Sequence, residues 1–196
     1  IIAVMNHYNP PNKDKIIQDI LDFKISIKSG VTALFQLIPS VNKSEIEAFV
    51  ADQIKKRAGF EEFVDFCNKN RIKLDITSGG IDFLIEPILT FSDTRYAIYS
   101  NSAHFESEFI QVENINANPA CDTCGTCKVK LLESEANFEI VIGDSVTDYY
   151  SSRLAHAVFA THGLQDYCKN DQIPYTPFNN FFEIIEVFKL WQTRIK

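Results

Sequence analysis

The segment that most constrains the fold is an apolar run that ends in two acids. The run, Phe138–Ile142, stops at Gly143, and Asp144 and Asp148 follow four positions apart. A helical stretch, Tyr149–Ala155, comes next. This order predicts a buried strand of a parallel sheet that carries carboxylates at its C-terminal end, where open sheets of this kind hold their ligands.

The two acids allow two interpretations. One helical turn separates Asp144 from Asp148, so both carboxylates can face one small volume, which suits a hard cation such as Mg2+. Alternatively, Asp144 and Ser145 are good N-cap residues, and the acids serve only to begin the helix. Taken alone, the segment favours neither a magnesium site nor a helix cap.

The periodicity of the chain changes near residue 70. Residues 1–70 carry apolar side chains at helical spacing and no convincing strand pattern, which predicts a helical cap. From residue 71 onward, short strands alternate with helices, which is typical of a parallel α/β core. We therefore predict a cap over 1–70 and an α/β core over 71–196, with a hairpin and a Cys-rich loop near 100–127.

Composition excludes several classes of function. The 196 residues are 45% hydrophobic and 23% charged, with a net charge of -7. This acidic balance argues against a nucleic-acid or anionic-membrane surface, and no apolar run approaches the roughly 20 residues of a membrane span. Five cysteines, an odd number, favour a reducing compartment, so we expect a cytoplasmic protein.

Two further motifs suit a phosphate ligand. Ser78, Gly79 and Gly80 follow a predicted strand, and glycine N–H groups beside a hydroxyl make a good oxyanion cradle, although an ordinary strand-to-helix turn would read the same. Lys128 begins a predicted helix, where its ammonium could neutralise a phosphate. A lysine there is also commonly just a solvated charge, and Lys130 is a competitor.

The order of these motifs resembles that of the haloacid dehalogenase superfamily of phosphotransferases. Ser78–Gly80, then Lys128, then the Asp144–Asp148 segment look like its second, third and fourth motifs, on the expected elements. The resemblance implies a Rossmann-like core with a cap inserted after the first motif. Residues 78–83 and 142–148 most resemble the methionine-salvage branch, which hydrolyses 2-hydroxy-3-keto-5-methylthiopentenyl-1-phosphate and lies close to the phosphoserine phosphatases.

The resemblance also implies roles for individual residues. Asp144 would ligate Mg2+, and Asp148 would ligate it or hold its waters. Ser78 and the Gly79 amide, with Gly80 beside them, would bind phosphate oxygens. Lys128 would neutralise charge between the phosphate and an attacking aspartate.

The sequence departs from the superfamily in its first motif. An Asp-x-Asp-x-Thr run after the first strand supplies the nucleophile there, and no such run occurs in these residues. Because the chain starts on Ile1 in apolar sequence, we expect that run and the first core strand to lie upstream. A catalytically inactive module that binds a phosphate ligand or a protein is the alternative.

A cysteine cluster forms a separate candidate site. Cys121, Cys124 and Cys127 could hold a structural Zn2+, with a fourth ligand from His104, Cys67 or water. The second, distant Cys pair of a strong zinc signature is absent, so a redox-sensitive dithiol or plain reduced thiols stay open.

The substrate implied by the resemblance is a small phosphorylated metabolite. Phosphoserine, phosphoethanolamine and phosphocholine are alternatives to the methionine-salvage compound. Residues of the cap that could contact it are Asn6, His7, Tyr8 and Ser29. We expect neither a nucleic-acid partner nor a membrane, and a homodimer is left open.

Overall fold

The computed structural model describes residues 1–132 and 138–194, and the chain divides into two compact units. Unit one comprises Ile1–Lys55, Asp75–Asp93 and Ala97–Cys127, and unit two comprises Lys56–Leu74, Thr94–Tyr96 and Lys128–Lys196. Neither unit is a single stretch of chain, so each has a core built from distant parts of the sequence. None of the helices in the described ranges combines the length and apolar content needed to cross a lipid bilayer.

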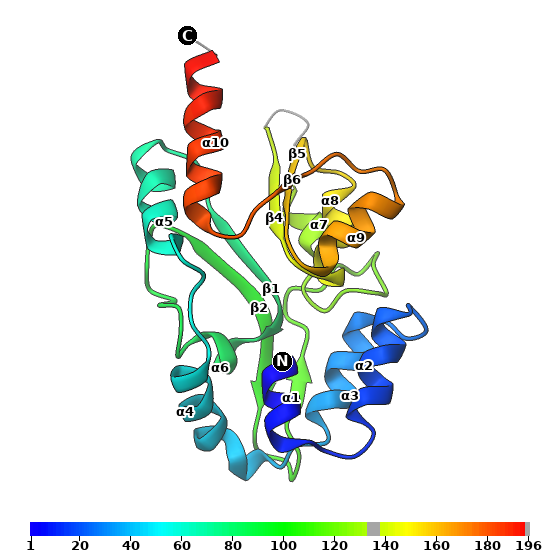
Figure 1. The fold of residues 1–196 in the computed structure, drawn as a ribbon. Helices are drawn as coiled ribbons and strands as arrows, with labels where there is room; N and C mark the ends of the chain where they lie inside the picture. Colours follow the sequence, from blue (N-terminus) through cyan, green and yellow to red (C-terminus); the bar gives the residue numbers. More distant parts are fainter. Residues whose placement is uncertain (133–137, 195–196) are drawn as a thin grey trace. The chain divides into compact units, whose positions relative to one another are not determined.

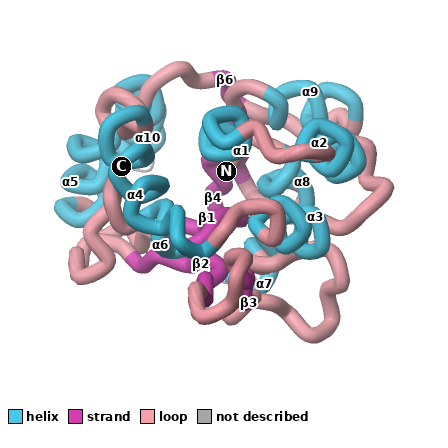
Figure 2. Tube along the Cα trace, turned by 90° about the horizontal axis from the view of Figure 1, so that it is seen from below, coloured by secondary structure: helices cyan, strands magenta, loops and turns pink. Residues whose placement is uncertain are grey.

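Unit one joins a group of helices to a small mixed sheet (Figure 1). Strand β1 pairs in parallel with β2, and β2 pairs antiparallel with β3. The elements are α1 (Ile2–Tyr8), α2 (Lys13–Leu21), α3 (Ile27–Phe35), η1 (Ser40–Asn42), α4 (Lys43–Gln53), β1 (Asp75–Ile81), α6 (Asp82–Ile85), β2 (Ala97–His104) and β3 (Gln111–Glu113). Figure 2 shows that α1 to α4 follow one another through loops with no strand between them.

Strand β1 contains an irregularity at the glycine motif. Thr77 pairs with Tyr99, and the next paired residue, Ile81, pairs with Asn101. Between these pairs, three residues of β1, Ser78–Gly80, face the single residue Ser100 of β2, so the glycine motif bulges out of the ladder. The motif lies within the strand and not in a turn beyond it, so the predicted strand end near Thr77 was too early.

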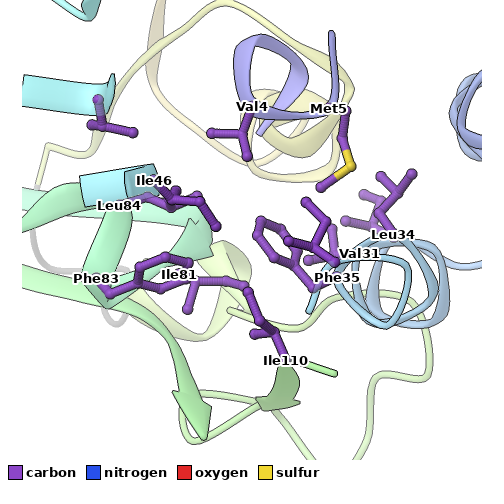
Figure 3. Packing of buried hydrophobic residues seen from close by; sticks show 13 residues of the cluster. Val4, Met5, Val31, Leu34, Phe35, Ile46, Ile81, Phe83, Leu84 and Ile110 are labelled. Carbon is purple, nitrogen blue, oxygen red and sulfur yellow. The ribbon is translucent and has the colours of Figure 1, made fainter. Parts of the chain in front are cut away.

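The core of unit one fixes the C-terminal end of this bulged segment. Ile81, fully buried, packs with Phe83 and Leu84 against helix residues such as Phe35 and Met5 (Figure 3). Phe35 and Phe83 meet edge to face with ring centroids 6.2 Å apart. Because Ile81 directly follows Gly80, this packing anchors the glycine motif to the helices of the N-terminal segment.

Unit two contains a three-stranded parallel sheet in the order β4-β5-β6 (Figure 1). The elements are α5 (Phe60–Lys69), α7 (Lys128–Leu131), β4 (Ile140–Gly143), η2 (Val146–Asp148), α8 (Tyr149–Ser152), β5 (Ala157–Ala160), α9 (Gly163–Asn170), β6 (Thr176–Pro177) and α10 (Phe181–Arg194). Phe159 of β5 is buried with Phe63 of α5 and Phe188 of α10. Aromatic packing therefore holds the sheet and its longest helix together.

The α/β fold class predicted from the sequence is confirmed, with the strands arranged as two three-stranded sheets. Residues 1–70 contain helices and no strand, parallel strands follow, and β2 pairs antiparallel with β3. The division into a cap over 1–70 and a core over 71–196 stays a prediction. Helix α5, part of the predicted 1–70 cap, belongs to unit two.

Candidate active site

A capping box at the start of η2 fixes the backbone that directly follows strand β4. Ser145 is the N-cap of η2, and Asp148 is the acid at the N3 position of a capping box. Oδ2 of Asp148 accepts hydrogen bonds from the backbone N–H groups of Asp144, at 3.0 Å, and Ser145, at 3.2 Å. Of the two residues named as possible N-caps, Ser145 is the N-cap and Asp144 is not, while Asp148 takes the N3 position.

The second oxygen of Asp148 holds a lysine. Lys128 Nζ donates to Asp148 Oδ1 at 2.5 Å and to Thr147 Oγ1 at 3.1 Å. The side chains of Lys128 and Asp148 are only 11% and 9% exposed, so this ion pair lies in poorly solvated surroundings. Coulombic attraction is much stronger there than between exposed charges, and the lysine is held in one orientation.

Gly143 leaves the space that the Asp148 side chain occupies. A Cβ atom on Gly143 would lie 2.5 Å from Cγ and 2.6 Å from Cβ of Asp148. Real Cβ atoms do not approach other carbon atoms so closely, so any other residue here would displace the Asp148 side chain. The glycine that ends β4 is therefore required by the capping acid rather than by backbone conformation.

Asp144 differs from Asp148 in almost every respect. Its carboxylate is exposed and, within the part of the chain that the structure describes, has no hydrogen-bond or ion-pair partner. Its backbone is fixed on both sides, because its N–H donates to Asp148 and its C=O accepts from the N–H of Leu164 at 3.2 Å. A rigidly placed, unpaired carboxylate at the C-terminal edge of a parallel sheet fits a cation ligand.

The donor set suits magnesium better than a cation that needs a full protein cage. Among residues 1–132 and 138–194, no group of three or more His, Cys, Asp or Glu side chains is arranged to hold a metal ion. Mg2+ keeps several waters and is commonly bound through one or two carboxylates together with phosphate oxygens. Asp144 alone, with Asp148 occupied by other partners, meets that requirement.

In unit one, the glycine motif is organised by its own serine and by an asparagine of β2. The Gly80 N–H donates to Ser78 Oγ at 3.0 Å, which leaves the serine hydroxyl hydrogen available for another acceptor. Asn101, 1% exposed, donates from Nδ2 to the carbonyl oxygens of Gly79 and Gly80, both at 3.0 Å. In a trans peptide the C=O and N–H point in opposite directions. Asn101 therefore turns two carbonyls away from the side where the next N–H groups are presented.

Asn101 is a residue that the sequence interpretation missed. It lies on β2, outside the recognised motifs. What identifies it is the structure: its side-chain amide is buried beside the register shift of the neighbouring strand β1. A polar residue in the interior of a strand demands hydrogen-bond partners, and the two glycine carbonyls provide them. Lys130, the competitor of Lys128, is exposed, and no ion pair of its side chain occurs in the described residues.

Three of the four cap residues named as substrate contacts have partners of their own, whereas the buried Tyr8 hydroxyl has no hydrogen-bond partner among the described residues. Asn6 Oδ1 accepts from the buried Lys13 Nζ at 3.1 Å, and the His7 ring stacks on Phe49 with centroids 4.2 Å apart. Ser29 Oγ accepts from Ser26 Oγ at 2.8 Å. Their contact with a substrate stays a prediction.

The structure lends no support to zinc in the cysteine cluster. Cys121, Cys124 and Cys127 are free thiols and do not form a metal-binding group in the described ranges. His104, the suggested fourth ligand, contacts Glu113 at 2.7 Å, and Cys67 lies in the core of unit two. The absence of the distant second Cys pair in the sequence already weakened that interpretation.

Curated relatives cover nearly all of the chain. It is 37% identical over 189 residues to the 2-hydroxy-3-keto-5-methylthiopentenyl-1-phosphate phosphatase of Bacillus cytotoxicus, covering 94% of this chain and 86% of that protein. It is also 37% identical to the protein of the same name from Brevibacillus brevis, covering 100% of this chain and 90% of that protein. A scan against protein-family models gave no match.

Solved structures with the same fold include phosphoserine phosphatases. A phospho-aspartyl intermediate analogue of phosphoserine phosphatase superposes with a TM-score of 0.65 at 18% identity, covering 90% of this chain and 84% of that one. Phosphoserine phosphatase from T. onnurineus gives a TM-score of 0.65 at 12% identity, covering 95% and 85%. Together with the curated relatives, these similarities show that the chain belongs to the 2-hydroxy-3-keto-5-methylthiopentenyl-1-phosphate phosphatase family of the haloacid dehalogenase superfamily.

Proposed function

We propose that the protein is a Mg2+-dependent phosphatase that hydrolyses 2-hydroxy-3-keto-5-methylthiopentenyl-1-phosphate in methionine salvage. The observation that carries the proposal is the 37% identity to phosphatases of that name over nearly the whole chain. It is supported by the exposed, unpaired carboxylate of Asp144 beside the buried Lys128–Asp148 pair.

Within this proposal, the glycine motif binds phosphate. The Ser78 hydroxyl hydrogen, free because Ser78 Oγ already accepts from Gly80, donates to a phosphate oxygen. The backbone N–H groups around Gly79 and Gly80 add donors that carry no side chain to block an approaching anion. Asn101 acts as a positioning residue, because it holds the carbonyls of the motif away from the anion.

Lys128 supplies fixed positive charge. As the phosphoryl group transfers, negative charge spreads over its equatorial oxygens, and an oriented ammonium stabilises that charge without reorganisation. Asp148 and Thr147 keep the lysine in place, and the low exposure of the pair preserves the strength of its field.

Asp144 would hold the magnesium ion. When bound, Mg2+ supplies a Lewis acid that polarises a phosphoryl oxygen. Asp148 stabilises the backbone on which Asp144 stands, since Asp148 accepts from the Asp144 N–H. No residue is assigned as the nucleophile, because the printed sequence contains no Asp-x-Asp-x-Thr run.

Phosphate release by the protein from its complete reading frame tests this function. We expect release from the methionine-salvage substrate with Mg2+, and Asp144→Asn should lower kcat by about a hundredfold or more. Asp166→Asn is the matched control, because Asp166 is an exposed acid of α9. Full activity of Asp144→Asn would refute the metal assignment, and preference for phosphoserine, phosphoethanolamine or phosphocholine would refute the substrate.

The absent Asp-x-Asp-x-Thr run favours one alternative, a module that binds a phosphate ligand without turnover. Its signature would be saturable binding of inorganic phosphate, weakened by Ser78→Ala, in a protein that hydrolyses none of the four substrates. We further propose a cytoplasmic location, because all five cysteines are free thiols. Sedimentation analysis would decide whether a homodimer forms.

A further inference from the structure

The cysteine loop, residues 114–127, places two thiols next to each other. Cys121 and Cys124 are three positions apart in this loop and close enough to perturb each other's pKa, and Thr123 Oγ1 lies 3.3 Å from the Cys121 sulfur. Cys121 is partly exposed, whereas Cys124 is 8% exposed. One thiol of the pair is thus accessible to a reagent, and the other is buried in the same loop.

The two thiols differ in acidity. Burial raises the pKa of Cys121, but hydrogen bonds from the Thr123 hydroxyl, the backbone N–H groups of Cys124 and Thr123, and the Cys124 thiol together lower that pKa to about 7. Burial, the larger cause, and the neighbouring Cys121 side chain raise the pKa of Cys124 to about 12. Since the thiolate is the nucleophile, Cys121 is the attacking residue and Cys124 the resolving one.

The loop that carries the pair is held at several points. The Cys121 N–H donates to the Asn118 carbonyl at 2.8 Å, and the Cys127 N–H donates to the Asn116 carbonyl at 3.1 Å. Thr123 accepts from the Lys28 N–H of α3 at 3.0 Å. Because the loop is anchored, a backbone displacement caused by a new covalent bond between Cys121 and Cys124 would move the residues that the loop contacts.

Those surroundings include the glycine motif. Thr126 Oγ1 donates to Asn101 Oδ1 at 3.4 Å, and both side chains are buried. A Cβ on Gly125 would lie 2.7 Å from Asn101 Oδ1, so the loop backbone closely approaches the asparagine. Asn101 in turn holds the carbonyls of Gly79 and Gly80. Asn101 thus links residues 124–126 to the glycine motif, because it contacts both.

We propose that Cys121 and Cys124 form a reversible thiol-modification site that reacts with low-molecular-weight disulfides and converts to an intramolecular disulfide. Closure of that disulfide shifts Gly125 and Thr126 against Asn101 and thereby disturbs the glycine motif. The effect on catalysis rests on the proposed phosphatase function, whereas the thiol chemistry does not.

The reaction balances with one disulfide as the oxidant. The Cys121 thiolate attacks one sulfur of the small disulfide, forms a mixed disulfide and releases one small thiolate. Cys124 then gives up its proton and attacks the Cys121 sulfur, which expels the second small thiolate. Two protein thiols are oxidised, one small disulfide is reduced to two thiols, and a dithiol reductant reverses both steps.

Thiol counting under denaturing conditions tests the chemistry. The intact protein is equilibrated with glutathione disulfide, quenched in acid, unfolded and alkylated, and its mass is measured. We expect five alkylated cysteines before treatment and three after it, with five restored by dithiothreitol. Cys127→Ser is the matched control in the same loop and should lose the same two thiols. Cys124→Ser should stop at a mixed disulfide with glutathione on Cys121.

Two further measurements follow the consequence of oxidation. Phosphate release by the wild type should fall roughly tenfold on oxidation and recover on reduction, because small displacements of binding groups are costly, while Cys124→Ser should resist. The side-chain amide signals of Asn101, followed by NMR, should shift on oxidation even if the reduced protein releases no phosphate, which would be a failure of the proposed function alone.

Three outcomes would overturn the proposal. The first is five alkylated cysteines after treatment, and the second is stoichiometric zinc in protein purified without chelator, since the thiols would then be ligands. The third is a Cys121–Cys124 disulfide that leaves both activity and the Asn101 signals unchanged, which would remove the link to the glycine motif.

Discussion

Replacement of Asp148 by Asn is the substitution that best distinguishes the structural role of Asp148 from the metal-binding role proposed for Asp144. The substitution keeps the size of the side chain and one carbonyl oxygen, which can still accept from the backbone N–H groups of Asp144 and Ser145. It removes the negative charge next to Lys128 Nζ, whose side chain is 11% exposed. Lys128 is then a largely buried cation with only the Thr147 hydroxyl as an acceptor.

The expected cost follows from the burial of the pair. Removing one partner of a buried ion pair destabilises a protein by about 3–5 kcal/mol, because the remaining charge has lost its compensation. We expect about 3 kcal/mol for Asp148→Asn, since the amide keeps the backbone hydrogen bonds. Asp144→Asn should change the free energy of unfolding by no more than about 0.5 kcal/mol, because that side chain is exposed and unpaired.

Urea unfolding followed by tryptophan fluorescence measures the difference. Trp191, the single tryptophan, stacks on Phe188 with ring centroids 5.3 Å apart and reports on unit two, which contains Asp148. The double variant Lys128→Met with Asp148→Asn should recover most of the loss, because the unpaired charge is gone. Both single Asp variants should nevertheless lose phosphatase activity.

Equal unfolding midpoints for the wild type and Asp148→Asn would refute this reasoning. So would a double variant that is less stable than Asp148→Asn, since the loss would then not come from an uncompensated lysine. A large destabilisation by Asp144→Asn would show that this carboxylate has a structural partner, and would undermine its assignment to magnesium.

Three further predictions concern other residues. Asn101→Asp should weaken the binding of inorganic phosphate about tenfold or more, measured by calorimetry, because a carboxylate repels the Gly79 and Gly80 carbonyls and the anion alike; binding equal to wild type would contradict its positioning role. Gly143→Ala should lower the free energy of unfolding by about 1–3 kcal/mol in urea, because its Cβ would displace Asp148; a wild-type midpoint would contradict the steric argument. The rate of Cys121 alkylation by iodoacetamide should rise with pH with a midpoint near 7, since the thiolate exists above its pKa of about 7; a midpoint near 9 would contradict the lowered pKa.

The sequence was informative where a local pattern determines the structure. Helical spacing predicted the helical character of residues 1–70, and the apolar run before Gly143 predicted β4, because burial of apolar side chains imposes these periods directly. The same reasoning placed the end of β1 too early. Glycines usually interrupt a strand, and only pairing with Tyr99 and Asn101 on a distant strand keeps the motif inside β1.

The sequence predicted which residues belong to the candidate site, but not the different roles of Asp144 and Asp148 within it. Spacing suggested that Asp144 and Asp148 face one volume, yet it cannot say which carboxylate already has partners. The bond from Lys128 to Asp148 joins residues 20 positions apart, and the bonds from Asn101 to the glycines join residues 21 and 22 apart. Such contacts depend on tertiary packing, which no short window of sequence contains.

The division between the two acids has a physical reason that links stability to function. A carboxylate that is to bind a hydrated cation has to remain exposed and unpaired, so it cannot also hold the backbone together. A carboxylate that caps a helix and fixes a lysine uses both oxygens and has to be buried to do so effectively. Placing the two acids four residues apart lets Asp148 immobilise the peptide that carries Asp144 through one hydrogen bond of 3.0 Å. The backbone of Asp144 is thereby fixed while both of its carboxylate oxygens stay free, so the proposed magnesium site depends on Asp148 for its geometry.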